Sequence, residues 1–292
     1  MMRISVRNFG DDMTAKRNYM RRRSVKLFSN YSRRTLAQLL SVSSGVHPAT
    51  NGDYSLAYRP NAFVPKIPWN PIRESEIESY FELGGDWQQS RSVAILGPTS
   101  KLLSFIDGAQ LGKNSVHELN TELINGIAET IFELLQESCE FCGNSILIGL
   151  ARNAPNMPTV SINRKLGRLV GLHVDYWDAL PLTQRGRSMN RISLNIGPSS
   201  RKILLVPSVL EDMATDLADR AGLSADLPAL PALYMNAFAS EISVVGCELG
   251  PGAAYIVPTE NILHDGSTLG QCQESRQIVF RGNISPIMTK VV

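Results

Sequence analysis

The sequence has few cysteines, a modest content of charged residues and no long apolar run. Its 292 residues include 4 Cys, and 19% are Asp, Glu, Lys or Arg. Four cysteines are too few for a disulfide scaffold of this size, so we expect a reducing compartment, the cytoplasm. No segment approaches the roughly 20 apolar residues of a membrane-spanning helix. Without repeats or low-complexity blocks, the chain is not a solenoid, collagen-like protein or coiled coil.

Positive charge is concentrated near the N-terminus. Residues 1–34 contain ten Lys or Arg and two Asp, a net charge of +8, whereas the whole chain carries +2, which leaves −6 for the rest. Such a segment can contact nucleic acid or an anionic surface. We expect instead a solvated basic arm with a helical segment over residues 1–60, and neither nucleic acid nor a membrane as partner.

A main domain is expected over residues 61–292, joined to the arm by the Pro-rich stretch Pro60–Pro71. Two of its segments carry helix signals. A capping-box pattern at Ser115–Glu118 precedes apolar residues spaced four apart and predicts a long helix. A second capping-box pattern at Ser208–Glu211 predicts a shorter helix that stops at Gly222.

The rest of the main domain consists of short β-type runs separated by Gly, Pro and Asn clusters. Many short strands, with helices mainly before them, predict a mainly β protein with flanking helices, an antiparallel sandwich or jelly roll. The segment Leu249–Gly252 lacks the spacing of a dinucleotide-binding fingerprint. The predicted strands are residues 145–150, 159–164, 169–174, 191–196, 202–206, 241–249, 253–257 and 277–284.

Two of the four histidines belong to a pattern with metal-binding chemistry. His173 and Asp175 follow an apolar run, and residues i and i+2 of a strand point to the same face. His264 follows a later strand. Two imidazoles and one carboxylate on one face of an octahedral metal leave three positions open, as in non-haem Fe(II) oxygenases. Those positions suit a bidentate 2-oxo acid and dioxygen. Alone, either histidine is also consistent with an ordinary hydrogen-bonded residue at a strand end.

The sequence from Gly167 to Ile284 resembles the iron(II)/2-oxoglutarate-dependent dioxygenases. The resemblance rests on His173, Asp175, His264 and Arg276. It implies a double-stranded β-helix core of the cupin-like jelly-roll type, with the first three residues as iron ligands and catalytic residues. It also implies Fe(II), 2-oxoglutarate as co-substrate and O2 as cofactors. The arginine of the last core strand then pairs with the distal carboxylate of 2-oxoglutarate.

Arg276 and Arg281 both lie on the predicted last strand, and an odd spacing places their side chains on opposite faces. Arg276 shares its face with the apolar residues Ile278 and Phe280, so we expect Arg276 inside the barrel. A buried guanidinium is tolerable where a carboxylate pairs with it bidentately. The spacing from His264 to Arg276 is slightly longer than the family usually shows.

Other residues near these positions are candidates for supporting roles. Asn190 and Arg191 begin the next strand and are candidates for binding the co-substrate or the substrate. Asp265 lies on the opposite side of the strand from His264, which suits orienting a ligand better than binding metal. Tyr176, Trp177 and Asp178 are candidates for the walls of a substrate pocket, and aromatic packing at a strand end explains them equally well.

Cys139 and Cys142 have the spacing of half a zinc site or of a redox pair. Because Cys247 and Cys272 do not repeat that spacing, we expect free thiols.

The expected function is hydroxylation of an unactivated C–H bond with succinate and CO2 as co-products. Asp175 favours hydroxylation over halogenation, because its carboxylate occupies the position that a halide would need. The expected substrate is a small molecule, such as an amino acid derivative or natural-product intermediate. The alternative is a non-oxidative β-sandwich protein, either a cupin-type isomerase or a ligand-binding protein. The sequence indicates no oligomeric state.

Overall fold

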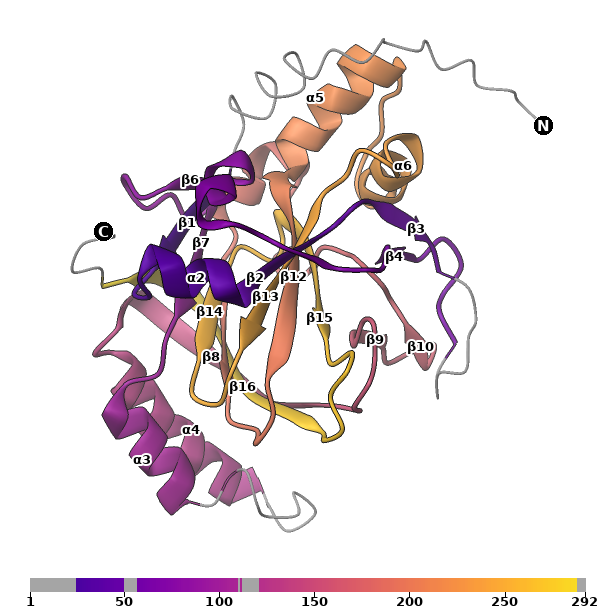
Figure 1. Cartoon of the computed structure of the whole chain (residues 1–292). Coiled ribbons are helices and arrows are strands. Elements are labelled where there is room, and N and C mark those ends of the chain that lie inside the picture. The colour runs from indigo at the N-terminus through magenta and orange to yellow at the C-terminus, as the bar shows by residue number, and fades with distance from the viewer. Residues whose placement is uncertain (1–24, 50–56, 110, 112–120, 288–292) are drawn as a thin grey trace.

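In the computed structural model, the described residues are 25–49, 57–109, 111 and 121–287, and they form two facing β-sheets flanked by helices (Figure 1). The large sheet has seven strands in the spatial order β6-β1-β7-β14-β11-β16-β8. β1 runs parallel to both of its neighbours, and the other pairings are antiparallel. The strands are β6 (Phe81–Leu83), β1 (Val25–Ser29), β7 (Ser92–Leu96), β14 (Ala254–Val257), β11 (Asn190–Asn195), β16 (Ser275–Pro286) and β8 (Cys139–Asn153).

The small sheet has five strands in the order β15-β12-β13-β2-β5, all antiparallel. From β11 onward the chain alternates between the two sheets: β11 lies in the large sheet, β12 and β13 in the small one, β14 in the large, β15 in the small and β16 in the large. This winding confirms the expected double-stranded β-helix core. The strands are β15 (Ile262–Ser267), β12 (Arg201–Val209), β13 (Val244–Leu249), β2 (Leu40–Ser43) and β5 (Asn70–Pro71).

Helices cover the outer faces of both sheets, so the central strands are buried on both sides, whereas the edge strands β8 and β5 stay largely exposed. α3 (Ser100–Gly108) and α4 (Thr121–Leu135) pack on the large sheet through residues such as Ile131, Leu194 and Phe280. α5 (Leu210–Ala221) and α6 (Ala229–Ala237) pack on the small sheet. The other elements are α2 (Arg33–Leu39), η1 (Glu74–Ser79), η3 (Leu182–Arg187), the strand pair β3 (Val46–Pro48) and β4 (Phe63–Pro65), and the strand pair β9 (Ile162–Asn163) and β10 (Arg168–Leu169).

The space between the sheets is apolar on one side and polar on the other. Leu27, Val245 and Tyr255 belong to the apolar cluster, on the side where β1 and β2 close the barrel. Toward β16 and β8, buried polar side chains take over: Ser193 Oγ donates to Gln277 Oε1 at 2.5 Å, and Gln277 Nε2 donates to Asn153 Oδ1 at 3.2 Å. A polar interior is costly unless its groups are hydrogen-bonded, and it suits a polar ligand.

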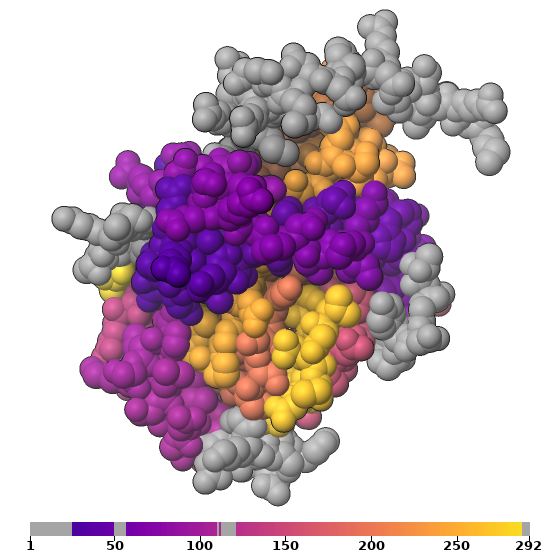
Figure 2. All heavy atoms as spheres, in the orientation of Figure 1, coloured from indigo at the N-terminus to yellow at the C-terminus, as the bar shows by residue number. Residues whose placement is uncertain are grey.

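The structure corrects three predictions about how the chain is organised. Residue 60 is no domain boundary, because β1 and β2 are hydrogen-bonded into the two main sheets. In Figure 2, the indigo and purple atoms of the N-terminal part lie against the orange and yellow atoms of the core. The capping box at Ser208 does not form: β12 runs to Val209, which is the N-cap of α5 and offers no side-chain hydrogen bond. Gly222 ends that helix in the left-handed conformation as expected. Two predicted strands shrink to the two-residue β9 and β10.

Two further predictions about chain organisation concern segments outside the described residues. Residues 1–24 of the basic arm and the capping-box pattern at Ser115–Glu118 fall there, whereas the helix expected after it is α4. Within the described part of the chain, no helix combines the length and the apolar character needed to span a membrane.

Candidate metal centre

The predicted triad comes together at β15, the strand at one edge of the small sheet. His264 lies in the middle of β15, and its backbone exchanges two hydrogen bonds with His173, of 3.0 and 2.8 Å. The backbone N–H of Asp175, two residues after His173, donates to the carbonyl of Thr259 at 2.9 Å. This hydrogen bond fixes the position of Asp175 and its carboxylate. Because His173 and Asp175 follow the extended-chain alternation, both side chains point to the side of His264.

The three side chains form a compact group of ligand atoms. One donor atom from each residue lies within 4.8 Å of the other two. His173 Nε2 is 3.6 Å from Asp175 Oδ1, and His264 Nε2 is 3.8 Å from Asp175 Oδ2. The side chain of His264 is 2% exposed, whereas those of His173 and Asp175 are 13% exposed, so solvent reaches the group mainly through the latter two.

Backbone carbonyls orient both imidazoles. His173 Nδ1 donates to the carbonyl of Gly171 at 2.8 Å, and His264 Nδ1 donates to that of Ile262 at 3.1 Å. A proton held on Nδ1 leaves the lone pair of Nε2 for a metal, and such a bond fixes the ring orientation. His264 Nε2 is buried without a hydrogen-bond partner among the described residues. A metal ion at this point would satisfy that atom.

The surroundings of the triad favour the metal-binding state of two of its three side chains, Asp175 and His264. Burial lowers the pKa of His264 to about 3, aided by the positive charges of His173 and Arg191. Burial acts to raise the pKa of Asp175, but the hydrogen bond of His173 and the charge of Arg191 act against it, and this pKa is lowered. Burial acts to lower the pKa of His173, but Asp175 and Asp265 outweigh it and raise that pKa. Asp175 is therefore ionised and His264 neutral, as ligation requires.

Asp265 lies on the opposite face of β15 from His264, in the position expected for a residue that orients a ligand. Its Oδ1 accepts backbone N–H groups of Val160, Ser161 and Gly266 at 3.2, 3.0 and 2.7 Å. Its Oδ2 is 3.8 Å from Nδ1 of His173. Burial raises its pKa against the effect of these bonds. The carboxyl group of Asp265 thus lies beside Nδ1 of His173, the ring nitrogen that carries the proton.

Arg191 and Asn190 point to opposite faces of β11, and only Arg191 reaches the triad. Its Nη1 lies 3.5 Å from Asp175 Oδ2, and its Nε is buried without a hydrogen-bond partner. Asn190 Nδ2 donates to the carbonyl of Ile284 at 3.0 Å. Asn190 therefore joins β11 to β16, and its predicted contact with a cofactor is not supported by this orientation.

The assignment of Arg276 to the barrel interior is wrong. Ile278 and Phe280, which share its face, belong to the apolar cluster beneath α3 and α4 on the outer side of the large sheet. Arg276 Nη1 donates to the carbonyl of Leu111 at 2.8 Å, and its Nε pairs with Glu274 at 3.2 Å. The apolar face of β16 packs on helices and does not line the barrel.

Arg201, which the sequence analysis missed, lies inside the barrel. Its side chain is 3% exposed, and Nη1 donates to Asn153 Oδ1 at 3.2 Å and Ser275 Oγ at 3.4 Å. Its Nε is buried without a hydrogen-bond partner, and no carboxylate of the described residues pairs with it. Burial lowers its pKa to about 10. The signal in the sequence is the alternation along β12. Arg201, Ile203 and Leu205 occupy every second position, and the two apolar residues belong to the cluster inside the barrel.

Arg281 faces the interior but is already paired. Its Nη2 lies 2.7 Å from Glu260 Oε1 and 2.9 Å from Asp178 Oδ2. Arg185, a fully buried residue of η3, pairs with the other oxygen of Glu260 at 3.1 Å and donates to the backbone carbonyl of Asp175 at 3.0 Å. These charges bind the segment after Asp175 to the turn before β15.

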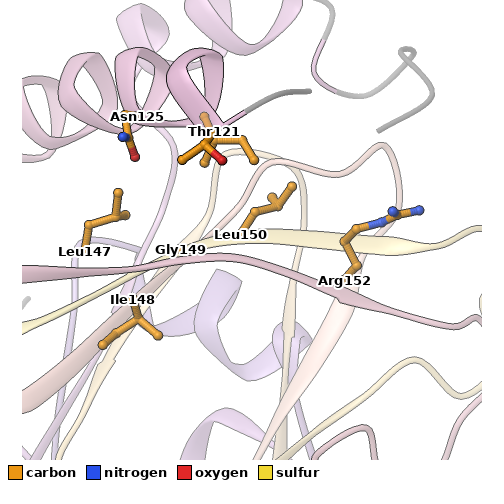
Figure 3. Close-up of a pocket in the computed structure, with 8 residues that line it drawn as sticks. Thr121, Asn125, Leu147, Ile148, Gly149, Leu150 and Arg152 are labelled. Atoms are coloured by element: carbon orange, nitrogen blue, oxygen red, sulfur yellow. The ribbon is translucent and has the colours of Figure 1, made fainter. Parts of the chain in front are cut away.

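A surface groove of about 500 Å³ lies elsewhere, between α4 and β8 (Figure 3). It is lined by residues such as Thr121, Asn125, Leu147 and Leu150, on the face of the large sheet opposite to the triad. The described residues that line it include no cluster of metal-binding or acid–base groups. The groove is therefore separate from the candidate metal centre.

Comparisons with known proteins give likenesses to solved structures only. No protein-family model and no curated protein matches the chain. Matching structures include the Kdo hydroxylase KdoO, described as a non-heme Fe(II) alphaketoglutarate dependent dioxygenase. The apo form has a TM-score of 0.37 at 16% identity, and the complex with succinate and Fe(III) has 0.35 at 15%. The complex with alphaketoglutarate and Fe(III) has 0.34 at 17%. Each alignment covers 67% of this chain and 80% of that chain. The function proposed below rests on this chain's own residues.

Proposed function

We propose that this protein is an Fe(II)/2-oxoglutarate-dependent oxygenase that hydroxylates an unactivated C–H bond of a small molecule. The observation that carries the proposal is the arrangement of His173, Asp175 and His264. Both imidazoles present an Nε2 lone pair oriented by a backbone carbonyl, and an ionised carboxylate lies beside them. Two nitrogen donors and one oxygen donor on one side of a metal are typical of oxygen-activating iron sites.

The donor set fits iron better than a structural zinc site. Structural zinc is closed by four protein ligands and is rich in cysteine. Here three donors converge, and no cysteine is among them. When bound with 2-oxoglutarate and O2, iron supplies oxygen activation coupled to loss of CO2 from the oxo acid, with succinate as co-product. The protein then has to bind the oxo acid, orient it and place the substrate.

Arg201 is the residue suited to the distal carboxylate of 2-oxoglutarate. A Cβ built on Gly266 would overlap with Arg201 Nη2, so the guanidinium lies against the inner face of β15 at Gly266. Gly266 is two residues beyond His264, about 6 to 7 Å along a strand. An extended five-carbon dicarboxylate can span that distance. Its carboxylate would pair with a buried cation that otherwise has no ion-pair partner among the described residues.

Arg191 is suited to the metal side of the same ligand. It lies 3.5 Å from Asp175, whose charge a bound metal ion would attract. The carboxylate next to the keto group of 2-oxoglutarate would then be its nearest anionic partner. The two arginines lie on the inner face of the barrel, one beside Asp175 and the other beside Ser275, and the charge of Arg191 lowers the pKa of Arg201. This arrangement matches the two ends of the proposed co-substrate.

We propose that the protein is located in the cytoplasm. All four cysteines are free, and two of them, Cys139 and Cys247, are buried. Free thiols suit a reducing compartment. Fe(II) is also retained more readily there than in an oxidising one.

Succinate formation tests the proposal. The purified protein, supplied with Fe(II), 2-oxoglutarate and O2, is expected to form succinate slowly even without its primary substrate, measured by chromatography over hours. Asp175→Ala removes one ligand and should lower this rate at least a hundredfold. Cys142→Ser, an exposed residue outside the site, is the control and should keep the wild-type rate. Equal succinate formation by Asp175→Ala and the wild type would contradict the proposal.

A further inference from the structure

We infer that the primary substrate carries a hydrocarbon group, bound on an exposed apolar patch of Trp177, Ile146 and Ile148 beside the metal centre. This inference rests on the proposed function, because it assigns the substrate class of the same site. Trp177 is 55% exposed, Ile146 47% and Ile148 38%. Large apolar side chains that lie together and in water mark a binding surface.

The register of the large sheet connects this patch to the metal centre. On the inner face, Arg191 of β11 lies opposite Arg281 of β16, and Arg281 lies opposite Ile146 of β8. Neighbouring strands are about 4.8 Å apart, so this row extends about 10 Å from Arg191 to Ile146. Arg191 is the residue that contacts Asp175. The patch thus begins about two strands away from a candidate metal ligand.

Trp177 lies above the same row. Its ring is 5.5 Å from the guanidinium of Arg281, so one face of the indole packs on a buried cation while much of the side chain stays in water. Ile148 points to the side of β8 opposite to Leu147 and Leu150, which face α4 (Figure 3). Trp177 and Ile146 are therefore both neighbours of Arg281, although they come from segments far apart in sequence.

The patch lies at an edge of the large sheet, because β8 is the last strand of that sheet. On the small sheet, the segment around His173 pairs with β15, and its Leu172 N–H donates to the carbonyl of Phe63. The side chains of His173 and Asp175 are each 13% exposed. Continuity with the metal centre is why we assign the patch to the substrate and not to a second protein.

The probes are a series of neutral primary alcohols, 1-pentanol, 1-hexanol and 1-heptanol. Their binding is followed by saturation-transfer NMR on the metal-free protein and on protein loaded with Mn(II) and 2-oxoglutarate under nitrogen. Mn(II) also accelerates relaxation of probe protons near it, and Zn(II) serves as the diamagnetic reference. Binding should tighten about threefold to fourfold per added methylene, the effect of burying one CH2 group.

Variants of the patch should weaken the binding of 1-heptanol. We expect about a tenfold loss for Trp177→Ser and about a threefold loss for Ile148→Ser. Leu233→Ser, which replaces an exposed residue of α6, is the matched control and should leave binding unchanged. Ile148 is a second route to the answer, because its exposed side chain contributes little to folding.

The outcomes separate this inference from the proposed function. If the alcohols do not bind, show no dependence on chain length, or bind equally to Ile148→Ser and the wild type, the inference is overturned. Binding without Mn(II)-dependent relaxation, in protein shown to hold Mn(II), places the probe away from the metal and also overturns it. Failure to hold any metal, with alcohol binding intact and sensitive to Ile148→Ser, contradicts the proposed function while the apolar site stands. A change of oligomeric state in Trp177→Ser by sedimentation, without loss of alcohol binding, would assign the patch to a second copy of the chain and overturn the inference.

Discussion

Two arginines of this protein differ in their surroundings, and that difference decides what each can bind. Arg201 is buried with no ion-pair partner among the described residues, and it hydrogen-bonds only to neutral oxygens. Arg276, on the other side of the large sheet, already pairs with Glu274 and a backbone carbonyl. A buried cation without a counter-ion is costly, and an incoming carboxylate offsets that cost. Arg201 is thus prepared for an anion, and Arg276 is not.

Lysine substitutions at the two arginines test this difference. Arg201→Lys keeps the charge but loses the bidentate fork, so the dissociation constant for 2-oxoglutarate should rise about tenfold, or about 1.4 kcal/mol. Arg276→Lys should change it less than twofold. Both constants are measured by anaerobic calorimetry on the metal-loaded protein. The reverse order of effects would return the role to Arg276.

At this scale the sequence predicted the three side chains that the structure brings together, but not that Arg201 is, among the described residues, the unpaired arginine of the barrel interior. His173, Asp175 and His264 are residue types that bind metals, so a pattern alone indicates them. The choice of Arg276 depended on which face of β16 is the inner one. Alternation shows which residues share a face, and it does not show which face is inner when both are buried. The apolar residues beside Arg276 pack on helices, and polar ones line the barrel.

Among the elements, β15 carries both a candidate metal ligand, His264, and a glycine, Gly266, that the side chain of Arg201 approaches closely. His264 and Gly266 share its inner face, and the guanidinium of Arg201 lies where a side chain at Gly266 would be. Gly266→Ala should therefore displace Arg201 and weaken 2-oxoglutarate binding at least tenfold, while metal binding changes little. Gly250→Ala, at a position where a Cβ meets nothing within 4 Å, is the control. Equal 2-oxoglutarate binding by Gly266→Ala and the wild type would show that the co-substrate does not reach Arg201.

The segment from Asp175 to η3 is held by buried charges, and this too has a measurable consequence. Arg185 is fully buried and donates to the carbonyls of Asp175, Leu180 and Glu260. Arg185→Met should loosen Asp175 and raise the dissociation constant for Co(II) about tenfold, followed by visible absorption. Because the change also leaves Glu260 with one partner fewer, folding is checked by circular dichroism. Arg33→Met, which removes the surface pair with Glu78, is the control. A folded Arg185→Met variant with wild-type Co(II) affinity would contradict this role.

For the whole molecule, the sequence predicted the jelly-roll class but not the role of its N-terminal part. The short strands with turn residues between them indicated the core that β11 to β16 form. The basic residues near the N-terminus suggested a separate arm up to residue 60, yet β1 pairs in register with β7 and β2 with β13. Such pairings join residues far apart in sequence, and local composition carries no information about them. The prediction of a basic arm therefore missed that β1 and β2 are strands of the two main sheets.

The most direct test of the central claim is a visible titration without oxygen. The claim is that His173, Asp175 and His264 hold Fe(II) while Arg201 holds the far end of 2-oxoglutarate. Anaerobic addition of Fe(II) and then 2-oxoglutarate should produce a weak metal-to-ligand charge-transfer band that neither gives alone. The band should be absent in Asp175→Ala and should need about ten times more 2-oxoglutarate in Arg201→Lys. The absence of a band in the wild-type protein, or an unchanged band in Asp175→Ala, would contradict the account.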